Sequence, residues 1–327
     1  MRIFILGTGT WGIALAKELF DNGHQVTCYS KFIDEINKLK ESRKQPNLPN
    51  LVIPKEINFV NELESSKEAD MVLFATPSIY IRSTVESFKP YYQGQLLVSV
   101  AKGIEKNTLL TMTEVIEDVL GINNQVVALT GPTHAEEVSV GIPTCIVSAC
   151  PNMDNAKKVQ VAFHSEVFRV YTNNDRRGSE LCGAFKNIIA LACGISDGLG
   201  FGDNTKAALI TRGVAELKRL GLAMGCNENT FSGLAGIGDL IVTATSKHSR
   251  NNKAGYLIGS GLSVEEAVKE VGMVVEGINC LDAAVQLCNK HNIHMPIVLA
   301  VNDIVNNHVD IKKVITGLMI REMKNEY

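Results

Sequence analysis

The chain has 327 residues, of which 32 are Lys or Arg and 35 are Asp or Glu, giving a formal net charge of −3. At roughly 150 residues per domain this length predicts about two domains. The absence of a basic excess argues against nucleic-acid binding. An apolar fraction of 45% and a charged fraction of 20% exclude a disordered chain.

The cysteines and the N-terminus indicate the compartment. Eight cysteines are scattered without a Cys-x-x-Cys pair, which argues against a metal site and favours reduced, buried thiols. The apolar run 3–6 is too short for a signal peptide, and no stretch approaches the roughly 20 apolar residues that cross a bilayer. We therefore expect a cytoplasmic protein with no metal and no stable membrane insertion.

Short apolar runs alternate with amphipathic segments over the first half of the chain, which predicts βαβ units around a largely parallel sheet. The predicted strands are 3–6, 25–29, 71–75, 96–100, 126–129, 145–148 and 167–171. The predicted helices are 11–20, 32–39, 79–88, 109–120 and 155–163. The polar stretch 41–50 contains two prolines and is expected to be an irregular surface excursion.

The pattern changes after residue 173. Apolar spacing predicts helices over 179–195, 205–220 and 264–270, and convincing strands disappear. We expect an α/β, Rossmann-like dinucleotide-binding domain over residues 1–178 and an all-α substrate-binding and catalytic domain over residues 179–327. Because no long flexible linker separates them, the two domains should pack closely.

A glycine-rich turn, Gly7-Thr8-Gly9-Thr10-Trp11-Gly12, lies between the first predicted strand and the first predicted helix. In a dinucleotide-binding turn, Gly7 would permit the tight bend, Gly9 would let the backbone approach a pyrophosphate, and Gly12 would let helix and strand pack closely. The phosphates would then meet the free N–H groups of the helix N-terminus. Trp11 could pack under the cofactor or fix the start of the helix.

The second strand bears on the choice of cofactor. An enzyme that uses NAD usually has an acidic residue about 20 residues after the turn, to bind the ribose 2′-hydroxyl. Here that place reads Tyr29-Ser30-Lys31. Without an acidic group, a 2′-phosphate could accept from Ser30 and pair with Lys31, so both NADP and NAD stay open. The alternative is that Lys31 is a solvated loop residue.

Four further segments are hard to explain as packing. Residues 98–103 form a buried-type strand that ends in Lys102, which is expected to point into the crevice at the carboxyl edge of the sheet. Residues 129–135 form a second strand followed by a small-residue turn, and residues 183–190 place Lys186 among apolar neighbours on a helix. The fourth segment, 236–251, ends in Ser-Arg-Asn, which would by residue type alone be a solvated basic loop.

Together these segments resemble the bacterial NAD(P)-dependent glycerol-3-phosphate dehydrogenase family over essentially the whole chain. The resemblance rests on the ordered set GTGTWG, SVAKG, LTGPTHAEE, GAFKNIIA, AGIGDL, SRN and VVEG. It departs from the family where Gly-Pro-Ser is Gly-Pro-Thr and where a frequent Arg is Lys31. It implies an oxidoreductase that interconverts sn-glycerol 3-phosphate and dihydroxyacetone phosphate, and that supplies glycerol 3-phosphate for phospholipid synthesis. A homodimer is the commonest expectation for such a protein.

The resemblance also implies site residues. In addition to the turn glycines and Ser30, the cofactor site would comprise Thr10, Trp11, Lys31, Lys102, Ala135, Arg250, Val274 and Glu276. The substrate site would comprise Lys102, Gly131, Thr133, Lys186, Asp239, Thr243, Ser249, Arg250 and Asn251. Lys186 matches the family's proton acceptor, and Lys102 and Asp239 would assist it.

The implied chemistry is physically consistent. Oxidation of a secondary alcohol needs a base for the hydroxyl proton while hydride leaves the same carbon. A lysine has an ordinary pKa near 10.4, so the pKa of Lys186 must be lowered by burial or by a second cation such as Lys102. Asp239 could orient the ammonium but would raise its pKa. Arg250 offers a planar fork of donors that matches two phosphate oxygens.

Two alternatives are left open. A β-hydroxyacid or 6-phosphogluconate type dehydrogenase shares the two-domain plan and a helix lysine, but it would need a carboxylate clamp in place of Ser-Arg-Asn. A non-catalytic NAD(P)-binding redox sensor could use the same glycine turn. It would have no reason to keep both Lys102 and Lys186.

Overall fold

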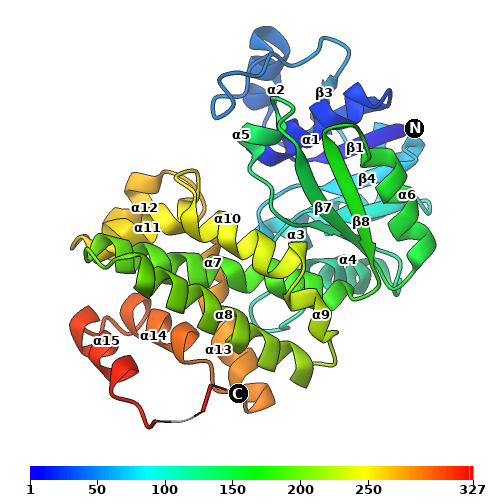
Figure 1. Ribbon diagram of the computed structural model, residues 1–327. Coiled ribbons are helices and arrows are strands. Elements are labelled where there is room, and N and C mark those ends of the chain that lie inside the picture. The colour runs from blue at the N-terminus through cyan, green and yellow to red at the C-terminus, as the bar shows by residue number, and fades with distance from the viewer. Residues whose placement is uncertain (324, 327) are drawn as a thin grey trace.

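The computed structural model describes residues 1–323 and 325–326, which form a sheet-containing lobe and an all-helical lobe (Figure 1). This confirms the predicted α/β domain followed by an α domain. Helix α7 (Arg176–Gly198) runs across the predicted boundary between residues 178 and 179, so that boundary remains a prediction.

The first lobe is built on one eight-stranded sheet in the order β3-β2-β1-β4-β5-β6-β7-β8. Neighbouring strands are parallel except β6 and β7, which are antiparallel. Helices cover both faces, so the inner strands are almost continuously apolar. The strands are β1 (Arg2–Leu6), β2 (Gln25–Tyr29), β3 (Asn58–Val60), β4 (Met71–Phe74), β5 (Leu96–Ser99), β6 (Val127–Thr130), β7 (Thr144–Ala149) and β8 (Phe168–Asn173).

The helices of this lobe follow the predicted order, with one wrong start. The predicted helix 109–120 begins only at Met112, because Leu109 has a φ of +61° and Thr111 caps the helix in a capping box with Glu114. The helices are α1 (Thr10–Asp21), α2 (Ile33–Ser42), α3 (Ile81–Phe88), α4 (Met112–Leu120), α5 (Ala135–Val138) and α6 (Met153–Phe163), with short 3₁₀ turns η1 (Glu64–Glu68), η2 (Ser78–Tyr80) and η3 (Lys89–Tyr91).

Strand order decides where a ligand can bind. From β1 the chain proceeds outward to β2 and β3 on one side and, after a crossover, to β4, β5 and β6 on the other. The crevice outside the carboxyl ends of the strands lies at such a reversal. The segments that follow β1, β2, β4, β5 and β6 all leave the sheet at this edge.

In the second lobe most helices pack around α7, whose residues from Gly178 to Ser196 are all buried, while α12 packs on α11 and α15 packs on α14 (Figure 1). Within the described residues, none of the helices is both long and apolar enough to span a bilayer. The other helices of this lobe are α8 (Asp203–Ala223), α9 (Glu228–Phe231), η4 (Leu234–Gly238), α10 (Asp239–Thr245), α11 (Arg250–Gly259), α12 (Val264–Val271), α13 (Glu276–His291), α14 (Pro296–Val305) and α15 (Ile311–Met319).

Glycines bring α11 against α7. Gly194 and Gly198 lie one turn apart on α7, and Gly255 and Gly259 lie one turn apart on α11. A Cβ at any of the four would come within 2.1–2.2 Å of a backbone carbonyl oxygen of the other helix. Only glycine permits this approach, which holds the N-terminus of α11 near the middle of α7.

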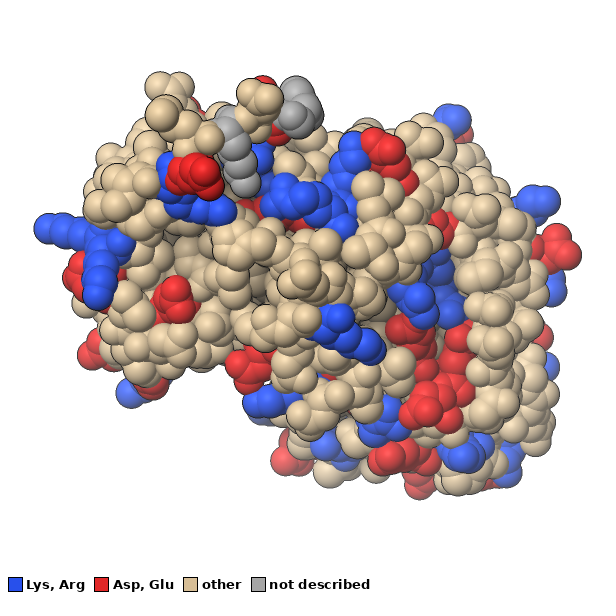
Figure 2. All heavy atoms as spheres, turned by 90° about the horizontal axis from the view of Figure 1, so that it is seen from below, with Lys and Arg blue, Asp and Glu red and all other residues tan. Residues whose placement is uncertain are grey.

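Buried ion pairing joins the two lobes. The guanidinium of Arg176, at the start of α7, donates to both carboxylate oxygens of Glu117 on α4 at 2.6 and 2.8 Å, and to the carbonyl of Val126 at 2.7 Å. Both partners are about 6% exposed. On the outside of the molecule, acidic and basic side chains are interspersed over the face shown in Figure 2, as the small net charge predicts.

Candidate active site

The glycine turn after β1 has the geometry expected for each glycine. Gly7 has a φ of +127°, and a Cβ there would lie 2.7 Å from the carbonyl oxygen of Ala75 at the end of β4. A Cβ at Gly12 would lie 2.3 Å from the Gly7 carbonyl oxygen, whereas a Cβ at Gly9 would meet nothing within 4 Å. No side chain caps the N-terminus of α1. The open space at Gly9 and the uncapped helix end therefore fit the pyrophosphate of a dinucleotide.

Two residues of the turn have other neighbours. The hydroxyl of Thr10 accepts a hydrogen bond of 3.3 Å from the amide of Asn47, which also lies 3.8 Å from the sulfur of Met273. The 41–50 excursion and the 273–276 segment of the helical lobe thus meet beside the turn. Trp11 is half-buried against the core of the first lobe, which favours its role at the start of the helix.

Two lysines share one buried carboxylate between the lobes. Asp239, the first residue of α10, is completely buried, and the side chains of Lys102 and Lys186 are 17% and 8% exposed. Lys102 donates to Oδ2 of Asp239 at 2.8 Å, and Lys186 donates to Oδ1. Lys186 also donates to the hydroxyl of Thr243 at 2.8 Å, and that hydroxyl donates to the Asp239 carbonyl at 2.6 Å. The structure thus brings together the predicted acid–base group.

The surroundings of Lys186 lower the pKa of its amine. Burial is the main cause that lowers the pKa of Lys186 to about 7; the nearby charge of Lys102 lowers it further, and Asp239 opposes both. A lysine in this state carries a proton for about half the time near neutral pH. It can therefore accept or donate a proton without a large free-energy cost.

The turn after β6 also fixes the position of the Lys102 ammonium. Lys102 donates to the carbonyl of Gly131 at 3.0 Å and to the hydroxyl of Thr133 at 3.3 Å. Gly131 has a φ of +150°, a value that favours glycine. Ala135 begins α5, an end that His134 leaves without a side-chain cap. The positions predicted in this segment therefore lie at one edge of the sheet, although only Gly131 and Thr133 contact a lysine of the cluster.

The Ser-Arg-Asn segment lies at the start of a helix, and its role in binding phosphate stays a prediction. Ser249 caps α11 by accepting from the backbone N–H of Asn252 at 3.2 Å. Arg250 is exposed, and its guanidinium forms no hydrogen bond or ion pair within the described residues. Asn251 is buried; its side-chain Nδ2 donates to Oδ1 of Asn187 at 2.9 Å, and its side-chain Oδ1 accepts from the Gly277 N–H at 2.8 Å. A guanidinium that has no partner among the described residues, at a helix N-terminus, is suited to an anion.

The segment before α13 reaches across to the first lobe. Glu276 accepts from the backbone N–H of Ser78 at 3.1 Å and from its hydroxyl at 2.5 Å. Burial raises the pKa of the Glu276 carboxyl, while the hydrogen bonds from Ser78 and the charge of Arg250 oppose the rise. Val274 is half-buried beside it. Since Ser78 follows β4, Glu276 lies over the carboxyl edge of the sheet.

Comparison with known proteins identifies the family. Residues 2–156 match the family model described as NAD-dependent glycerol-3-phosphate dehydrogenase N-terminus, and residues 175–316 match the corresponding C-terminus. A Lactobacillus delbrueckii subsp. bulgaricus protein named glycerol-3-phosphate dehydrogenase [NAD(P)+] 2 is 56% identical over 99% of this chain and 98% of its own. The chain belongs to the NAD(P)-dependent glycerol-3-phosphate dehydrogenase family. The predicted resemblance is thereby confirmed.

Other members of the family agree. The Agathobacter rectalis protein named glycerol-3-phosphate dehydrogenase [NAD(P)+] is 46% identical over 100% of this chain and 98% of its own. The crystal structure of glycerol-3-phosphate dehydrogenase from Coxiella burnetii superposes with a TM-score of 0.93 at 36% identity, covering 98% of this chain and 99% of that one. The similarity therefore extends through both lobes.

The end of β2 corrects one expectation about the cofactor of this family member. An acidic group is present there: the hydroxyl of Ser30 donates to Glu35 at 2.6 Å. Lys31 is exposed, with its ammonium 5.2 Å from the ring centroid of Phe32 and 5.8 Å from that of Tyr80. The pair Ser30–Glu35 suits a ribose 2′-hydroxyl and Lys31 suits a 2′-phosphate, so both NAD and NADP still fit.

Sequence reasoning missed four residues of this neighbourhood. Asn187 and Ser78 bind predicted site residues, Asn47 contacts Thr10, and Glu35 contacts Ser30. Asn187 directly follows Lys186, and Ser78 follows a predicted strand at the ligand-binding edge. The positions of Asn187 and Ser78 in the sequence could therefore have indicated them, whereas Asn47 and Glu35 lie in segments without a motif. In the described part of the chain, no group of three or more His, Cys, Asp or Glu side chains is arranged to hold a metal.

Gly12→Ala tests the glycine turn. We expect the variant to bind NADPH at least about tenfold more weakly, because its Cβ would overlap the Gly7 carbonyl and force the turn open. Fluorescence titration with NADPH measures the change. Gly202→Ala is the matched control, since a Cβ at Gly202 meets nothing within 4 Å. Unaltered NADPH affinity in Gly12→Ala would show that the cofactor does not use this turn.

Proposed function

We propose that this chain interconverts sn-glycerol 3-phosphate and dihydroxyacetone phosphate with NADPH or NADH, and so supplies glycerol 3-phosphate for phospholipid synthesis. The observation that carries the proposal is the cluster of Lys102, Lys186 and Asp239 beside the N-terminus of α11. In this proposal Lys186 is the proton-transfer group and the start of α11 is the anion-binding group, both near the carboxyl edge of the sheet.

Lys186 performs the proton transfer in this proposal. In the oxidation direction its neutral amine accepts the proton of the substrate's C2 hydroxyl; in the reduction direction its ammonium returns a proton to the developing alkoxide. The nicotinamide, when bound, accepts or supplies the hydride. Asp239 and Thr243 fix the position of the Lys186 Nζ atom, and Lys102 places a second positive charge near the oxygen that gains negative charge.

Arg250 and the start of α11 bind the phosphate in this proposal. The Arg250 guanidinium is exposed, and the preceding Ser249 begins the helix. The β-hydroxyacid type alternative would need its cationic group placed for a carboxylate next to the reacting carbon, and the helix N-terminus at Arg250 better suits a separate dianionic group. The redox-sensor alternative gives no reason for two lysines on a buried aspartate.

Arg250→Gln tests the phosphate contact. The KM for dihydroxyacetone phosphate should rise about 10- to 100-fold, since a hydrogen bond to a charged group contributes about 1.5–3 kcal/mol. With unphosphorylated dihydroxyacetone the variant and the unaltered protein should have equal kcat/KM. Lys253→Gln, one helical turn away on α11 and exposed, is the control. An unchanged KM for the phosphorylated substrate would remove Arg250 from the substrate site.

The activity itself is tested directly. The purified chain is mixed with dihydroxyacetone phosphate and NADPH or NADH, and the absorbance of the reduced nicotinamide is followed. We expect oxidation of the nicotinamide that depends on the phosphorylated substrate, and no comparable rate with β-keto acids. Turnover of the β-keto acids alone would favour the alternative dehydrogenase. Cofactor binding without any turnover would favour the sensor.

We also propose that the chain works as a homodimer in the cytoplasm. The dimer follows from the prevalence of closed two-fold assemblies; the cytoplasm is supported by eight cysteines that are all free. Sedimentation of the purified chain tests the first proposal, and fractionation of cells that contain it tests the second.

A further inference from the structure

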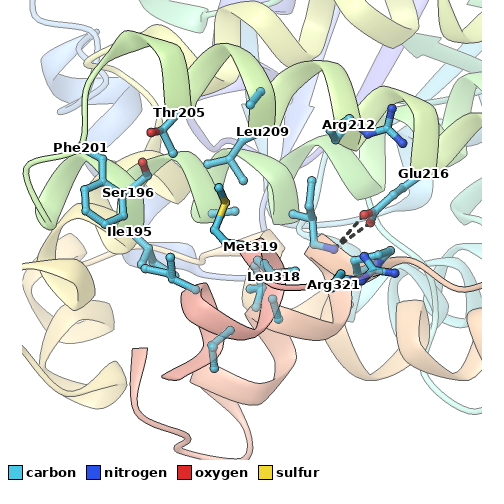
Figure 3. Close-up of a pocket in the computed structure, with 18 of the residues that line it drawn as sticks. Ile195, Ser196, Phe201, Thr205, Leu209, Arg212, Glu216, Leu318, Met319 and Arg321 are labelled. Atoms are coloured by element: carbon cyan, nitrogen blue, oxygen red, sulfur yellow. Dashed lines mark hydrogen bonds between the residues drawn. The ribbon is translucent and has the colours of Figure 1, made fainter. Parts of the chain in front are cut away.

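A cavity in the helical lobe shares no lining residue with the site around Lys186. Its volume is about 680 Å³, within the range of about 300–1,000 Å³ typical of small-molecule sites. Apolar side chains make up most of its lining, among them Ile195, Leu209 and Val301. Figure 3 shows the hydroxyls of Ser196 and Thr205 at one end and the charged side chains at the other.

Helix α15 forms one wall of this cavity. Val314, Ile315, Leu318 and Met319 line it, at spacings that place them along one side of the helix. None of the residues of α15 is buried, and Met319 is 80% exposed, whereas Val314 also packs against the core of the lobe. A hydrocarbon body in the cavity would contact α15 on one side and the helices α8 and α14 on the other.

The charged end of the cavity contains one cation that has no partner among residues 1–323 and 325–326. Glu216 accepts from the backbone N–H of Ile297 at 2.9 and 3.1 Å, which uses its carboxylate to cap α14. Arg219 donates to the His294 carbonyl at 3.2 Å, and Arg321 lies 3.2 Å from the ring nitrogen Nδ1 of His294. Within the described residues the Arg212 guanidinium has no hydrogen bond or ion pair.

The acidic groups at this end do not cancel that charge. Glu216 is 3% exposed, and burial raises the pKa of its carboxyl to about 7, which reduces its negative charge near neutral pH. Glu322 and Glu326 also line the cavity, and both are exposed, so solvent screens them. The Arg212 side chain is half-buried, and its guanidinium has no partner among the described residues. A free guanidinium beside an apolar cavity is complementary to a ligand with one anionic head group and a hydrocarbon body.

We propose that this cavity binds an acyl anion, with the carboxylate on Arg212 and the acyl chain between α8, α14 and α15. The chemistry of the site favours this occupant over a neutral hydrocarbon, which would leave Arg212 unused. A second copy of the chain in this place is an outcome that the test below distinguishes.

Calorimetric titration of the purified full-length chain with dodecanoate, below its aggregation concentration, tests the proposal. We expect one dodecanoate per chain, at least about tenfold weaker binding to Arg212→Gln, and no measurable binding to Leu209→Trp, whose ring would fill the cavity. Acetate, which has the head without the chain, should not bind. Dodecanol should bind the unaltered protein and Arg212→Gln equally.

Controls separate binding from folding and from assembly. Lys218→Gln removes a positive charge from the same helix outside the cavity and should bind dodecanoate as the unaltered protein does. Both cavity variants should keep the nicotinamide-dependent turnover, because neither residue belongs to the proposed active site. The proposal is overturned if dodecanoate fails to bind, if it binds both variants unchanged, or if Leu209→Trp converts a dimer to monomers, which would show a second copy in this place.

Discussion

Replacing Lys186 with methionine is expected to lower kcat by about 10²- to 10⁴-fold in both directions, the range for loss of a general acid–base group. Methionine keeps the length and apolar stem of lysine but cannot carry the proton. NADPH affinity should be unchanged, because the glycine turn that is proposed to bind the pyrophosphate lies in the other lobe. Steady-state kinetics and NADPH fluorescence titration measure the two effects separately.

The pH dependence gives a second readout for the same residue. Because the pKa of Lys186 is lowered to about 7, the neutral amine becomes the main form as pH rises through 7. The kcat/KM for oxidation should therefore rise as pH increases through 7, and the kcat/KM for reduction should fall above pH 7. Both of these pH dependences should be absent in Lys186→Met. Lys253→Met, on the exposed side of α11, should retain both pH dependences. Retained turnover in Lys186→Met would remove the lysine from the reaction.

The glycine turn shows what the sequence could predict. The roles of Gly7, Gly9 and Gly12 depend on backbone approaches within a single strand–turn–helix unit, so spacing along the chain was enough to assign them. The observed overlaps at Gly7 and Gly12 and the open space at Gly9 agree with those roles. The same holds for Lys102, whose place after a parallel strand predicted its position at the ligand-binding edge.

The helical lobe shows what the sequence could not predict. Asn187 and Asn251 are 64 residues apart and meet only because glycines on α7 and α11 let those helices approach. Neither helix carries a local signal for its partner. The Ser-Arg-Asn segment likewise resembled a loop by composition, since the cap of Ser249 contributes one hydrogen bond that a charge count does not reveal.

Two errors in the first lobe have local causes. Strand β3 has only three residues, which is too short for periodicity to indicate it. Glu35 was overlooked because the acidic partner was sought at the end of β2, whereas it lies in the first turn of the next helix and reaches back to Ser30.

Asp239→Asn tests the balance of charges on which Lys186 depends. In the unaltered protein the Asp239 carboxylate raises the pKa of Lys186 against burial and against Lys102. The amide removes that negative charge and turns a donor group toward one ammonium, so the pKa of Lys186 should fall below its present value. The kcat/KM for oxidation should then reach its plateau at lower pH, and reduction at pH 7 should slow because less of the ammonium remains.

The same substitution should destabilise the fold. Removing one partner of a buried ion pair costs about 3–5 kcal/mol, and the loss should be largest at acidic pH, where both lysines are charged, and smaller as pH rises and Lys186 becomes neutral. Urea unfolding at several pH values measures it. Asp197→Asn is the matched control: its pair with Lys206 is 23% exposed on both sides and should cost no more than about 1 kcal/mol. If Asp239→Asn leaves both the pH profile and the unfolding midpoint unchanged, the carboxylate does not set the charge state of Lys186. The pKa would then have to be governed by burial and Lys102 alone.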